Sequence, residues 1–308
     1  MIAIDWGTSS LRAYRLAADG TVLAQRHAAL GLLACRGRFA EVLAQQLDGW
    51  DEPLVLMAGM IGSRNGWQEV AYAACPAGVA DIAAGLHELP PDALPGRRLL
   101  IVPGLSHRAA GEAPEVMRGE ETQIVGLMDT LAGAATGADA VHRLCLPGTH
   151  SKWVQVANGR ITAFRTAMTG ELYALMRQHS LLAALMPPQA EDRDDAEAFE
   201  RGVVDSARAG GLSHHLFGVR TLGLFGALQP AAAASYLSGL LIGHELRAMW
   251  PSVAAGRAAG PVHLIGASGL VDRYARALGR LGASSLAHGE ALAARGLHAL
   301  ARARGLVP

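Results

Sequence analysis

One local sequence pattern occurs twice in this chain. The first copy has the run Asp-Trp-Gly-Thr-Ser-Ser at residues 5–10, and the second has Leu-Pro-Gly-Thr-His-Ser at residues 146–151. In each copy an apolar stretch leads into the run and a strand-like stretch leaves it, followed by Asp-Gly at 19–20 or Asn-Gly at 158–159. These pairs suit a two-residue hairpin loop because both central positions adopt positive φ. The sequence therefore predicts two strand–turn–strand units of the same design, as an internal duplication would produce.

The turn in each copy is suited to binding phosphate. A Gly-Thr-Ser turn between two strands exposes consecutive backbone N–H groups and small hydroxyls, which form a nest for phosphate oxygens. Two such turns facing each other would hold a polyphosphate from both sides, and the Asp5 carboxylate beside the first turn adds a ligand for Mg²⁺. A single copy would be better explained as an ordinary hairpin, whereas the duplication favours phosphate binding. The predicted phosphate-binding residues are Gly7, Thr8, Ser9, Ser10, Gly148, Thr149, His150, Ser151 and Lys152.

Composition argues against several classes of partner. The 308 residues contain 27 Lys and Arg and 27 Asp and Glu, so no excess charge favours nucleic acid or an anionic membrane. Cys35, Cys75 and Cys145 lack CxxC or zinc spacing and are typical of reduced thiols in a cytoplasmic protein. The N-terminus has no signal-like segment, and the apolar residues 231–246 carry enough polar residues to favour a buried helix over a membrane span. We expect a cytoplasmic protein with a small-molecule partner, no nucleic acid and no membrane.

Strand-like and helical segments alternate along the chain, which predicts an α/β protein with mixed sheets. The length suffices for two lobes, each with its own core. A small-residue connector at 133–139 places the boundary so that the lobes are residues 1–135 and 136–308, with the last helix free to pack back on the first lobe. A polar surface loop is expected at 187–195. Helices are expected at residues 38–47, 120–131, 168–176, 196–209, 231–250 and 270–281, and further strands at 53–57, 98–102 and 262–265.

The duplicated turns resemble the phosphate-binding elements of the sugar kinase, Hsp70 and actin superfamily. This resemblance implies an α/β fold of two ribonuclease-H-like lobes with an ATP cleft between them, and ATP and Mg²⁺ as cofactors. In that superfamily a glycine turn after a strand holds adenosine, and here such a turn follows the strand at 262–265. No GxGxxG opens the chain and no GxxxxGK[ST] occurs, so the sequence lacks the signature motifs of Rossmann and P-loop folds. The predicted adenosine-binding residues are Gly266, Ala267, Ser268 and Gly269, whose glycines leave the backbone open to a nucleotide.

Phosphoryl transfer to an alcohol also requires a carboxylate that accepts the hydroxyl proton. The resemblance to sugar kinases places this base at the start of a helix before the second turn, where the chain reads Arg118-Gly119-Glu120-Glu121. The kinase pattern usually has Gly-Asp, so Glu120 is the predicted base and Glu121 the alternative. Both acids would also complement the positive end of the helix dipole. Arg118 either neutralises bound charge or pairs with Glu121, and Lys152 either reaches the ATP phosphates or is a solvated strand residue.

A narrower resemblance rests on five segments taken together, residues 5–12, 59–67, 118–123, 146–153 and 168–172. They are similar to the 2-dehydro-3-deoxygalactonokinase family, and the similarity runs from the first strand to the final helices. This resemblance implies ATP-dependent phosphorylation of 2-dehydro-3-deoxy-D-galactonate at its 6-hydroxyl, a step of galactonate catabolism.

The substrate of that family carries a carboxylate, so its pocket should offer a fixed cation and short hydrogen-bond donors. Arg64, next to Ser63 after a strand, meets this requirement because a guanidinium recognises a carboxylate through two parallel hydrogen bonds. Arg165 is a rival anchor, and Glu171 either binds substrate hydroxyls or caps its helix. The predicted substrate-binding residues are Gly62, Ser63, Arg64, Arg118, Glu121, Arg165 and Glu171.

Three alternatives stay open at this stage. The chain could be a kinase of the same fold for another sugar or sugar acid, or a non-catalytic ATP-gated binding protein. A hydrolase with a metal held by His107, His150, Asp5 and Glu120 is less favoured, because no pair has ligand spacing and no second histidine completes an HExxH motif at residue 248. The preferred epimer of the acid and the oligomeric state, a homodimer included, are not determined by the sequence.

Overall fold

The structure, a computed structural model, describes residues 1–134, 141–188, 194–250, 260–289 and 291–308. The chain forms two compact units. Unit 1 comprises Met1–Val141, Val154–Phe164 and Glu290–Pro308, and unit 2 comprises His142–Trp153 and Arg165–Gly289. The boundary predicted between residues 135 and 136 and most of the loop predicted at 187–195 lie outside the described residues.

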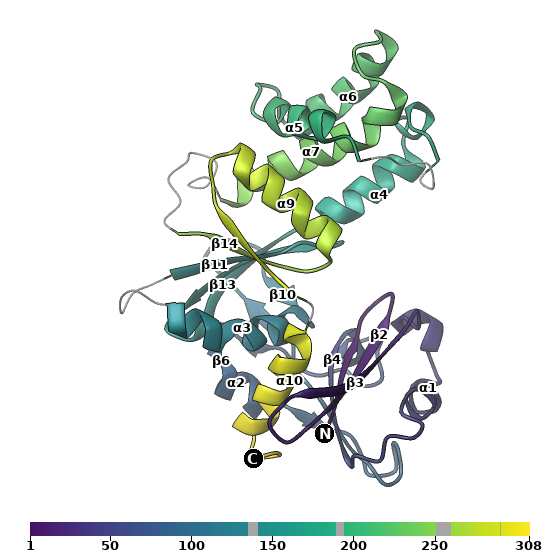
Figure 1. The fold of residues 1–308 in the computed structure, drawn as a ribbon, viewed down its shortest axis with the longest axis vertical. Helices are drawn as coiled ribbons and strands as arrows, with labels where there is room; N and C mark the ends of the chain where they lie inside the picture. The colour runs from purple at the N-terminus through teal and green to yellow at the C-terminus, as the bar shows by residue number, and fades with distance from the viewer. Residues whose placement is uncertain (135–140, 189–193, 251–259, 290) are drawn as a thin grey trace. The chain divides into compact units, whose positions relative to one another are not determined.

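Unit 1 contains a six-stranded mixed sheet of order β3-β2-β1-β4-β8-β7 (Figure 1). Strand β1 runs antiparallel to β2 and parallel to β4. A small sheet of order β10-β9-β5 accompanies it. The elements are β1 (Ile2–Trp6), β2 (Leu11–Leu16), β3 (Val22–Ala28), η1 (Leu32–Cys35), α1 (Phe39–Gln46), β4 (Leu54–Gly59), η2 (Met60–Gly62), β5 (Ala73–Ala74), β6 (Ala77–Gly78), α2 (Val79–Ala84), β7 (His87–Glu88), β8 (Arg98–Ile101), β9 (Leu105–His107), β10 (Glu115–Met117), α3 (Glu120–Ala134) and α10 (Leu292–Ala303).

The second six-stranded sheet repeats the order of the first. It runs β15-β14-β11-β12-β13-β6, so β13-β12-β11-β14-β15 corresponds to β3-β2-β1-β4-β8. Strands β11, β14 and β15 are parallel, as β1, β4 and β8 are. The duplication predicted from the sequence is therefore present in the strand topology. The remaining elements are β11 (Val141–Leu146), β12 (Ser151–Ala157), β13 (Arg160–Ala167), α4 (Thr169–His179), η3 (Ala183–Leu185), α5 (Ala196–Asp205), α6 (Gly211–Leu224), α7 (Pro230–Met249), β14 (Val262–Ile265), α9 (Ser268–Arg280) and β15 (Ser285–His288).

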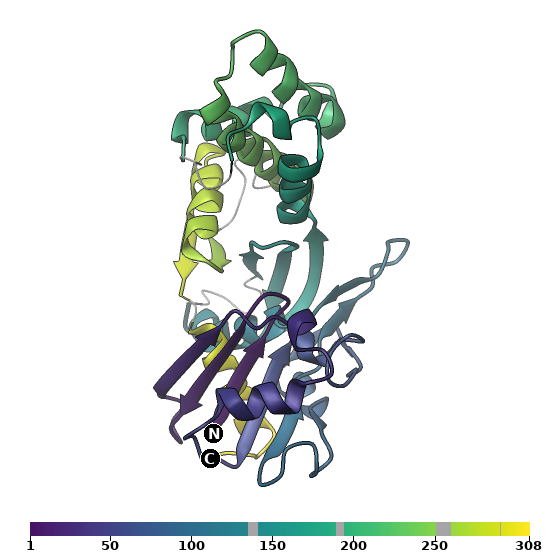
Figure 2. The ribbon, with the colours of Figure 1, turned by 90° about the vertical axis from the view of Figure 1, so that its right-hand side faces the viewer.

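Helix α1 covers one face of the unit 1 sheet, as Figure 2 shows. Alternate residues of β1 and the apolar side of α1 pack into one fully buried cluster, because side chains repeat every second residue on a strand and every 3.6 residues on a helix. The ring of Trp6 meets that of Phe39 edge-on, with centroids 5.6 Å apart. Helix α1 is thus held to the strand that ends at the first turn.

Helix α10 packs along α3 within unit 1, side by side in Figure 1. The approach is so close that a Cβ on Gly296 of α10 would lie 1.8 Å from the backbone oxygen of Thr122. Only glycine permits this contact at position 296. The first turn of α3, which carries Glu120 and Glu121, is therefore held in place by the C-terminal helix.

The two predicted hairpin loops differ in geometry. Asn158 and Gly159 have φ of 52° and 68°, so the prediction for this loop is confirmed. For the first loop the prediction of two positive φ values was wrong, because Gly20 has a φ of 85° but Asp19 does not adopt positive φ. The Asp19 carboxylate instead accepts a hydrogen bond from Thr21 N–H at 2.9 Å, and the β2–β3 register shifts at Arg15/Leu16. The first loop is thus a longer turn with a bulge.

Every predicted helix and strand is present, with ends that differ by a few residues. Helices α2 and α6 were not predicted, and neither were the short strands β5, β6, β7, β9, β10 and β15. No helix in the described part of the chain is long and apolar enough to cross a membrane.

Candidate active site

The two predicted phosphate turns present similar surfaces. In the first, Gly7 N–H donates to the Ser10 carbonyl at 2.9 Å. The glycine that opens each turn is partly buried, and the two residues after it are exposed, namely Thr8 and Ser9 in the first turn and Thr149 and His150 in the second. Exposed backbone and hydroxyl groups in a turn between strands are what a phosphate nest requires.

Asp5 lies at the end of β1, beside the first turn. Its side chain is 16% exposed, and Arg12 Nη1 lies 3.4 Å from Oδ2. A Cβ on Gly59, the last residue of β4, would lie 3.3 Å from Asp5 Oδ1, and a Cβ on Gly119 would lie 3.2 Å from Gly59 Cα. These two glycines have φ of 91° and 110°. The bare backbone of Gly119 brings the start of α3 against the end of β4, and β4 pairs with the strand that carries Asp5.

The two acids at the start of α3 differ in burial. Glu121 is fully buried, and its oxygens accept hydrogen bonds from Gly119 N–H at 2.7 Å and Thr122 Oγ1 at 3.1 Å. Burial, followed by the neighbouring Glu120 charge, raises the pKa of Glu121 to about 8, so this carboxyl is neutral at pH 7. Glu120 is only half-buried, and its Oε2 accepts from Arg118 N–H at 3.0 Å. Of the pair, only Glu120 is partly exposed; the substrate-binding role of Glu121 stays a prediction.

The arginines predicted to hold a carboxylate have different environments. The Arg64 side chain is 86% exposed and lies 3.6 Å from Glu69. Arg118 is 8% exposed; it donates from Nη2 to the Val70 carbonyl at 2.6 Å and lies over the Tyr72 ring at 4.4 Å. Its Nε and Nη1, and the buried Ser63 hydroxyl, have no hydrogen-bond partner among the described residues. Buried polar groups usually have partners, so these three atoms are candidates to bind a polar ligand.

The second turn is held by the start of α4, which brings two separately predicted motifs together. Glu171 N–H donates to the Thr149 carbonyl at 3.0 Å, and the Glu171 carboxylate lies 2.5 Å from His150 Nε2. A Cβ on Gly170 would lie 2.3 Å from the Gly148 carbonyl oxygen. Glu171 therefore contacts the second turn, and no side-chain hydrogen bond within the described residues caps α4.

The predicted adenosine segment also meets the second turn. Gly266 has φ of 154°, and a Cβ there would lie 3.3 Å from the carbonyl oxygen of Pro147, which precedes the turn. A small pocket of about 60 Å³ is lined by Gly148 of the second turn and by residues of α4, α7 and α9, but by none of residues 266–269. Its volume is below the range of roughly 300–1,000 Å³ typical of ligand sites, so an adenine base would require its walls to move apart. Its lining includes Gly148, Thr169, Gly170, Tyr173, Arg273 and Tyr274.

Three other predicted residues lie in unexpected surroundings. Lys152 is only 5% exposed and donates to Thr166 Oγ1 at 3.1 Å, so its interpretation as a solvated strand residue was wrong. Ser151 is fully buried, with its hydroxyl 2.8 Å from that of Tyr274, and does not face the nest. Arg165 is exposed.

The family of the chain follows from comparison with known proteins. The sequence model described as 2-keto-3-deoxy-galactonokinase matches residues 5–300. The chain belongs to this family. It is therefore a carbohydrate kinase, and the prediction from the sequence motifs is confirmed.

Relatives of this kinase agree with that assignment. The 2-dehydro-3-deoxygalactonokinase of Escherichia coli K12 is 36% identical over 286 residues, which cover 91% of this chain and 90% of the relative. A Rhizobium meliloti protein named for the same activity, DgoK1, is 37% identical over 307 residues, 98% and 96% of the two chains. A crystal structure of a Sinorhizobium meliloti protein described in the same way has a TM-score of 0.85 at 36% identity, with 98% of each chain covered.

The fold of the kinase extends to distant proteins. Component A of the (R)-2-hydroxyglutaryl-CoA dehydratase of Acidaminococcus fermentans has a TM-score of 0.52 at 13% identity, with 98% of each chain covered. Together with the matching strand order of the two sheets, this supports the predicted two-lobed α/β class.

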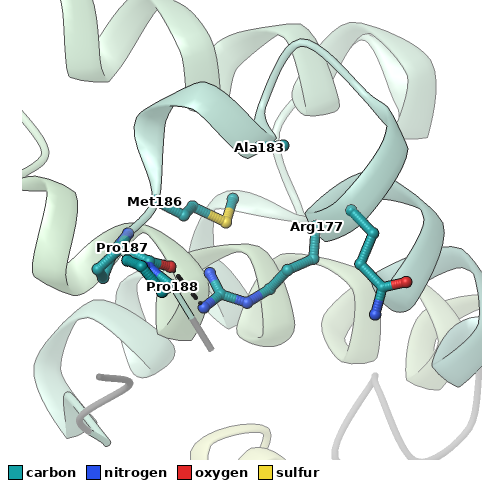
Figure 3. Close-up of a pocket in the computed structure, with 6 residues that line it drawn as sticks. Arg177, Ala183, Met186, Pro187 and Pro188 are labelled. Atoms are coloured by element: carbon teal, nitrogen blue, oxygen red, sulfur yellow. Dashed lines mark hydrogen bonds between the residues drawn. The ribbon is translucent and has the colours of Figure 1, made fainter. Parts of the chain in front are cut away.

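Unit 2 of the kinase has another pocket, of about 300 Å³, that none of the predicted site residues line. Figure 3 shows Arg177 extending along it toward Pro187, whose carbonyl accepts a hydrogen bond from Nη2 at 2.9 Å. Met186 and Pro188 also line it.

The metal-hydrolase alternative finds no support in this geometry. In the ranges that the structure describes, no three His, Cys, Asp or Glu side chains are grouped so that they could hold a metal ion. His107 packs against the Phe164 ring, with centroids 6.0 Å apart, and His150 is paired with Glu171.

Proposed function

We propose that this kinase transfers the γ-phosphoryl group of ATP to the 6-hydroxyl of 2-dehydro-3-deoxy-D-galactonate, as a step of galactonate catabolism. The observation that carries this proposal is the family assignment over residues 5–300, with relatives at 36% and 37% identity named for that activity. Two structural features meet requirements of such a reaction: a half-buried carboxylate at the start of a helix, and exposed turns suited to phosphate.

In this proposal Glu120 is the general base. Glu120 is the first residue of α3, next to Gly119, which packs against the end of β4, and its carboxylate would accept the proton of the attacking hydroxyl. Asp5 fits a Mg²⁺ ligand, because Mg²⁺ is usually held by one or two carboxylates together with phosphate oxygens and waters. When bound, Mg²⁺ would spread the charge of the transferring phosphoryl group. The exposed backbone and hydroxyl groups of each turn are suited to bind phosphate oxygens.

The nucleotide base is assigned to unit 2, at the pocket lined by Gly148 of the second turn and by residues of α4, α7 and α9. Helix α9 begins within the segment Gly266, Ala267, Ser268 and Gly269. Strand, glycine turn and helix occur there in the order the resemblance implied. The solved Clostridium difficile activator of 2-hydroxyisocaproyl-CoA dehydratase, similar in fold at a TM-score of 0.50, contains ADPNP. We infer ATP as the phosphoryl donor from the kinase family and place it at this turn.

The substrate carboxylate is assigned to Arg118 and Ser63 rather than to Arg64. The guanidinium of Arg118 is fixed by Val70 and Tyr72, and its Nε and Nη1 make no hydrogen bond to the described residues. The Arg64 side chain, in contrast, extends into solvent. Because these nitrogens are buried, we propose that the loop that follows η2 opens to admit the acid.

Substituting each arginine in turn shows which of the two binds the substrate carboxylate. Arg118→Lys should raise KM for the sugar acid by about 10–100-fold, because a charge-assisted hydrogen bond contributes about 1.5–3 kcal/mol, and leave KM for ATP unchanged. Arg64→Ala should change either KM by less than about threefold, because exposed ion pairs contribute little. Steady-state kinetics with each substrate varied measures both. An Arg64→Ala enzyme with weakened acid binding beside a normal Arg118→Lys enzyme would return the role to Arg64.

The reaction itself is tested by coupled ADP release with Mg-ATP. The acceptors to compare are 2-dehydro-3-deoxygalactonate, its gluconate epimer, galactonate, glucose and glycerol, with ³¹P and ¹³C NMR locating the phosphate on the product. We expect turnover only with the 2-dehydro-3-deoxy acids, and the phosphate on C6. Turnover of a plain sugar would overturn the substrate, and slow hydrolysis independent of any acceptor would favour the ATP-gated binding protein.

A further inference from the structure

A buried carboxylate on α7 collects hydrogen bonds from elements around the second turn. Glu245 is 5% exposed. Its Oε1 accepts from Trp153 Nε1 at 2.6 Å, and its Oε2 accepts from the Tyr274 hydroxyl at 2.7 Å. Burial raises the pKa of Glu245, while hydrogen bonds from Thr169, Tyr274, Trp153 and Ser151 act in the opposite direction.

The donors come from the elements to which the nucleotide was assigned. Ser151 and Trp153 begin β12, directly after the second turn. Thr169 is the first residue of α4, next to the glycine that contacts that turn. Tyr274 lies on α9, the helix that follows the adenosine segment, and its hydroxyl also lies 2.8 Å from Ser151 Oγ. One side chain on a fourth element, α7, thus connects β12, α4 and α9.

The same residues reach the pocket. Thr169 and Tyr274 line it together with Gly148 of the turn, whereas Glu245 does not. Glu245 therefore acts on the pocket only through its neighbours. A buried carboxylate is costly unless it is well hydrogen-bonded, and removing it would leave several buried donors without an acceptor.

We propose that Glu245 is a positioning residue for the nucleotide: it sets the relative placement of the second phosphate turn, α4 and α9 without touching ATP. This inference rests on the proposed nucleotide site in unit 2. In the sequence, Glu245 was notable only in His244-Glu245, the start of an HExxH motif that lacks its second histidine at position 248. The proposal gives Glu245 a role.

The test compares Glu245→Ala, Glu245→Gln and Tyr274→Phe with the unchanged enzyme. Glu245→Ala should raise KM for ATP at least about tenfold, as expected when a charge-assisted hydrogen bond is lost, with KM for the sugar acid within twofold. Glu245→Gln should restore most of the affinity, because an amide keeps an acceptor for Trp153 and can donate to the Tyr274 oxygen. Tyr274→Phe removes one hydroxyl only and should give a smaller rise in KM for ATP. It serves as the test variant if Glu245→Ala does not fold.

Tyr236→Phe is the matched control. The Tyr236 hydroxyl donates to the Asp205 carboxylate at 2.9 Å, so this variant also breaks a buried tyrosine–carboxylate bond in unit 2, on residues that do not line the pocket. It should lower Tm without changing KM for ATP. If Tyr274→Phe and Glu245→Ala leave KM for ATP within twofold, or raise both KM values equally, the positioning role is overturned.

Calorimetric titration of ATP into each protein, without the acid, separates this inference from the function on which it rests. Weaker ATP binding by the Glu245 and Tyr274 variants than by the unchanged protein and Tyr236→Phe supports it. Equal binding by all of them overturns it while leaving the kinase assignment intact. An unchanged protein that binds no ATP would overturn the proposed nucleotide site and this inference together.

Discussion

Glu120→Gln should lower kcat by about 10²–10⁴-fold, the usual contribution of a positioned general base. The amide keeps the size of the side chain and can still accept the hydrogen bond from Arg118 N–H, so the start of α3 should be preserved. What it loses is the ability to take a proton from the substrate hydroxyl. KM for both substrates should therefore change little, and the effect should appear in kcat measured by ADP release.

Glu121→Gln is the comparison that decides between the two acids. With its pKa raised to about 8, the Glu121 carboxyl is protonated in the folded protein at pH 7, so an amide reproduces its charge. We expect kcat within a few-fold of the unchanged enzyme. A Glu121→Gln enzyme that loses activity while Glu120→Gln keeps it would assign the base to Glu121.

Local sequence signals predicted most of the fold. Strands and the second hairpin loop follow from apolar alternation and Asn-Gly, which act over a few residues. Helix α6 gives a weaker signal, because it contains glycines at 218 and 223 and buries mainly His215 and Val219. Its packing against α7 stabilises it, and that contact is not visible in a local pattern.

The same distinction between local signals and tertiary packing applies to the candidate site. Motifs predicted the turns, the adenosine segment and Glu120, because each motif depends on neighbouring residues. The choice between Glu120 and Glu121 depends on burial, which arises from packing between elements and not from neighbouring residues. The Glu245 contacts with Trp153 and Tyr274 join residues 92 and 29 positions apart, so no spacing rule indicates them.

Gly170→Ala should lower kcat/KM for ATP by about 10²-fold and raise KM for ATP, because a displacement near 1 Å of a positioning group can cost that much in rate. A Cβ at position 170 would lie 2.3 Å from the Gly148 carbonyl oxygen and 2.9 Å from Thr149 Cα, both in the backbone of the second turn. Neither atom can turn aside as a flexible side chain could, so the turn must move away from α4. The hydrogen bond from Glu171 N–H to the Thr149 carbonyl should weaken with it.

The same substitution elsewhere in unit 2 isolates this steric effect. Gly279, in α9, is exposed, and a Cβ there would meet no atom of the described chain within 4 Å. Gly279→Ala should keep both KM values and raise Tm slightly, since alanine is favoured over glycine inside a helix. Because Gly170 contacts the turn through its backbone alone, a Gly170→Ala enzyme with normal KM for ATP would show that the second turn does not bind the nucleotide.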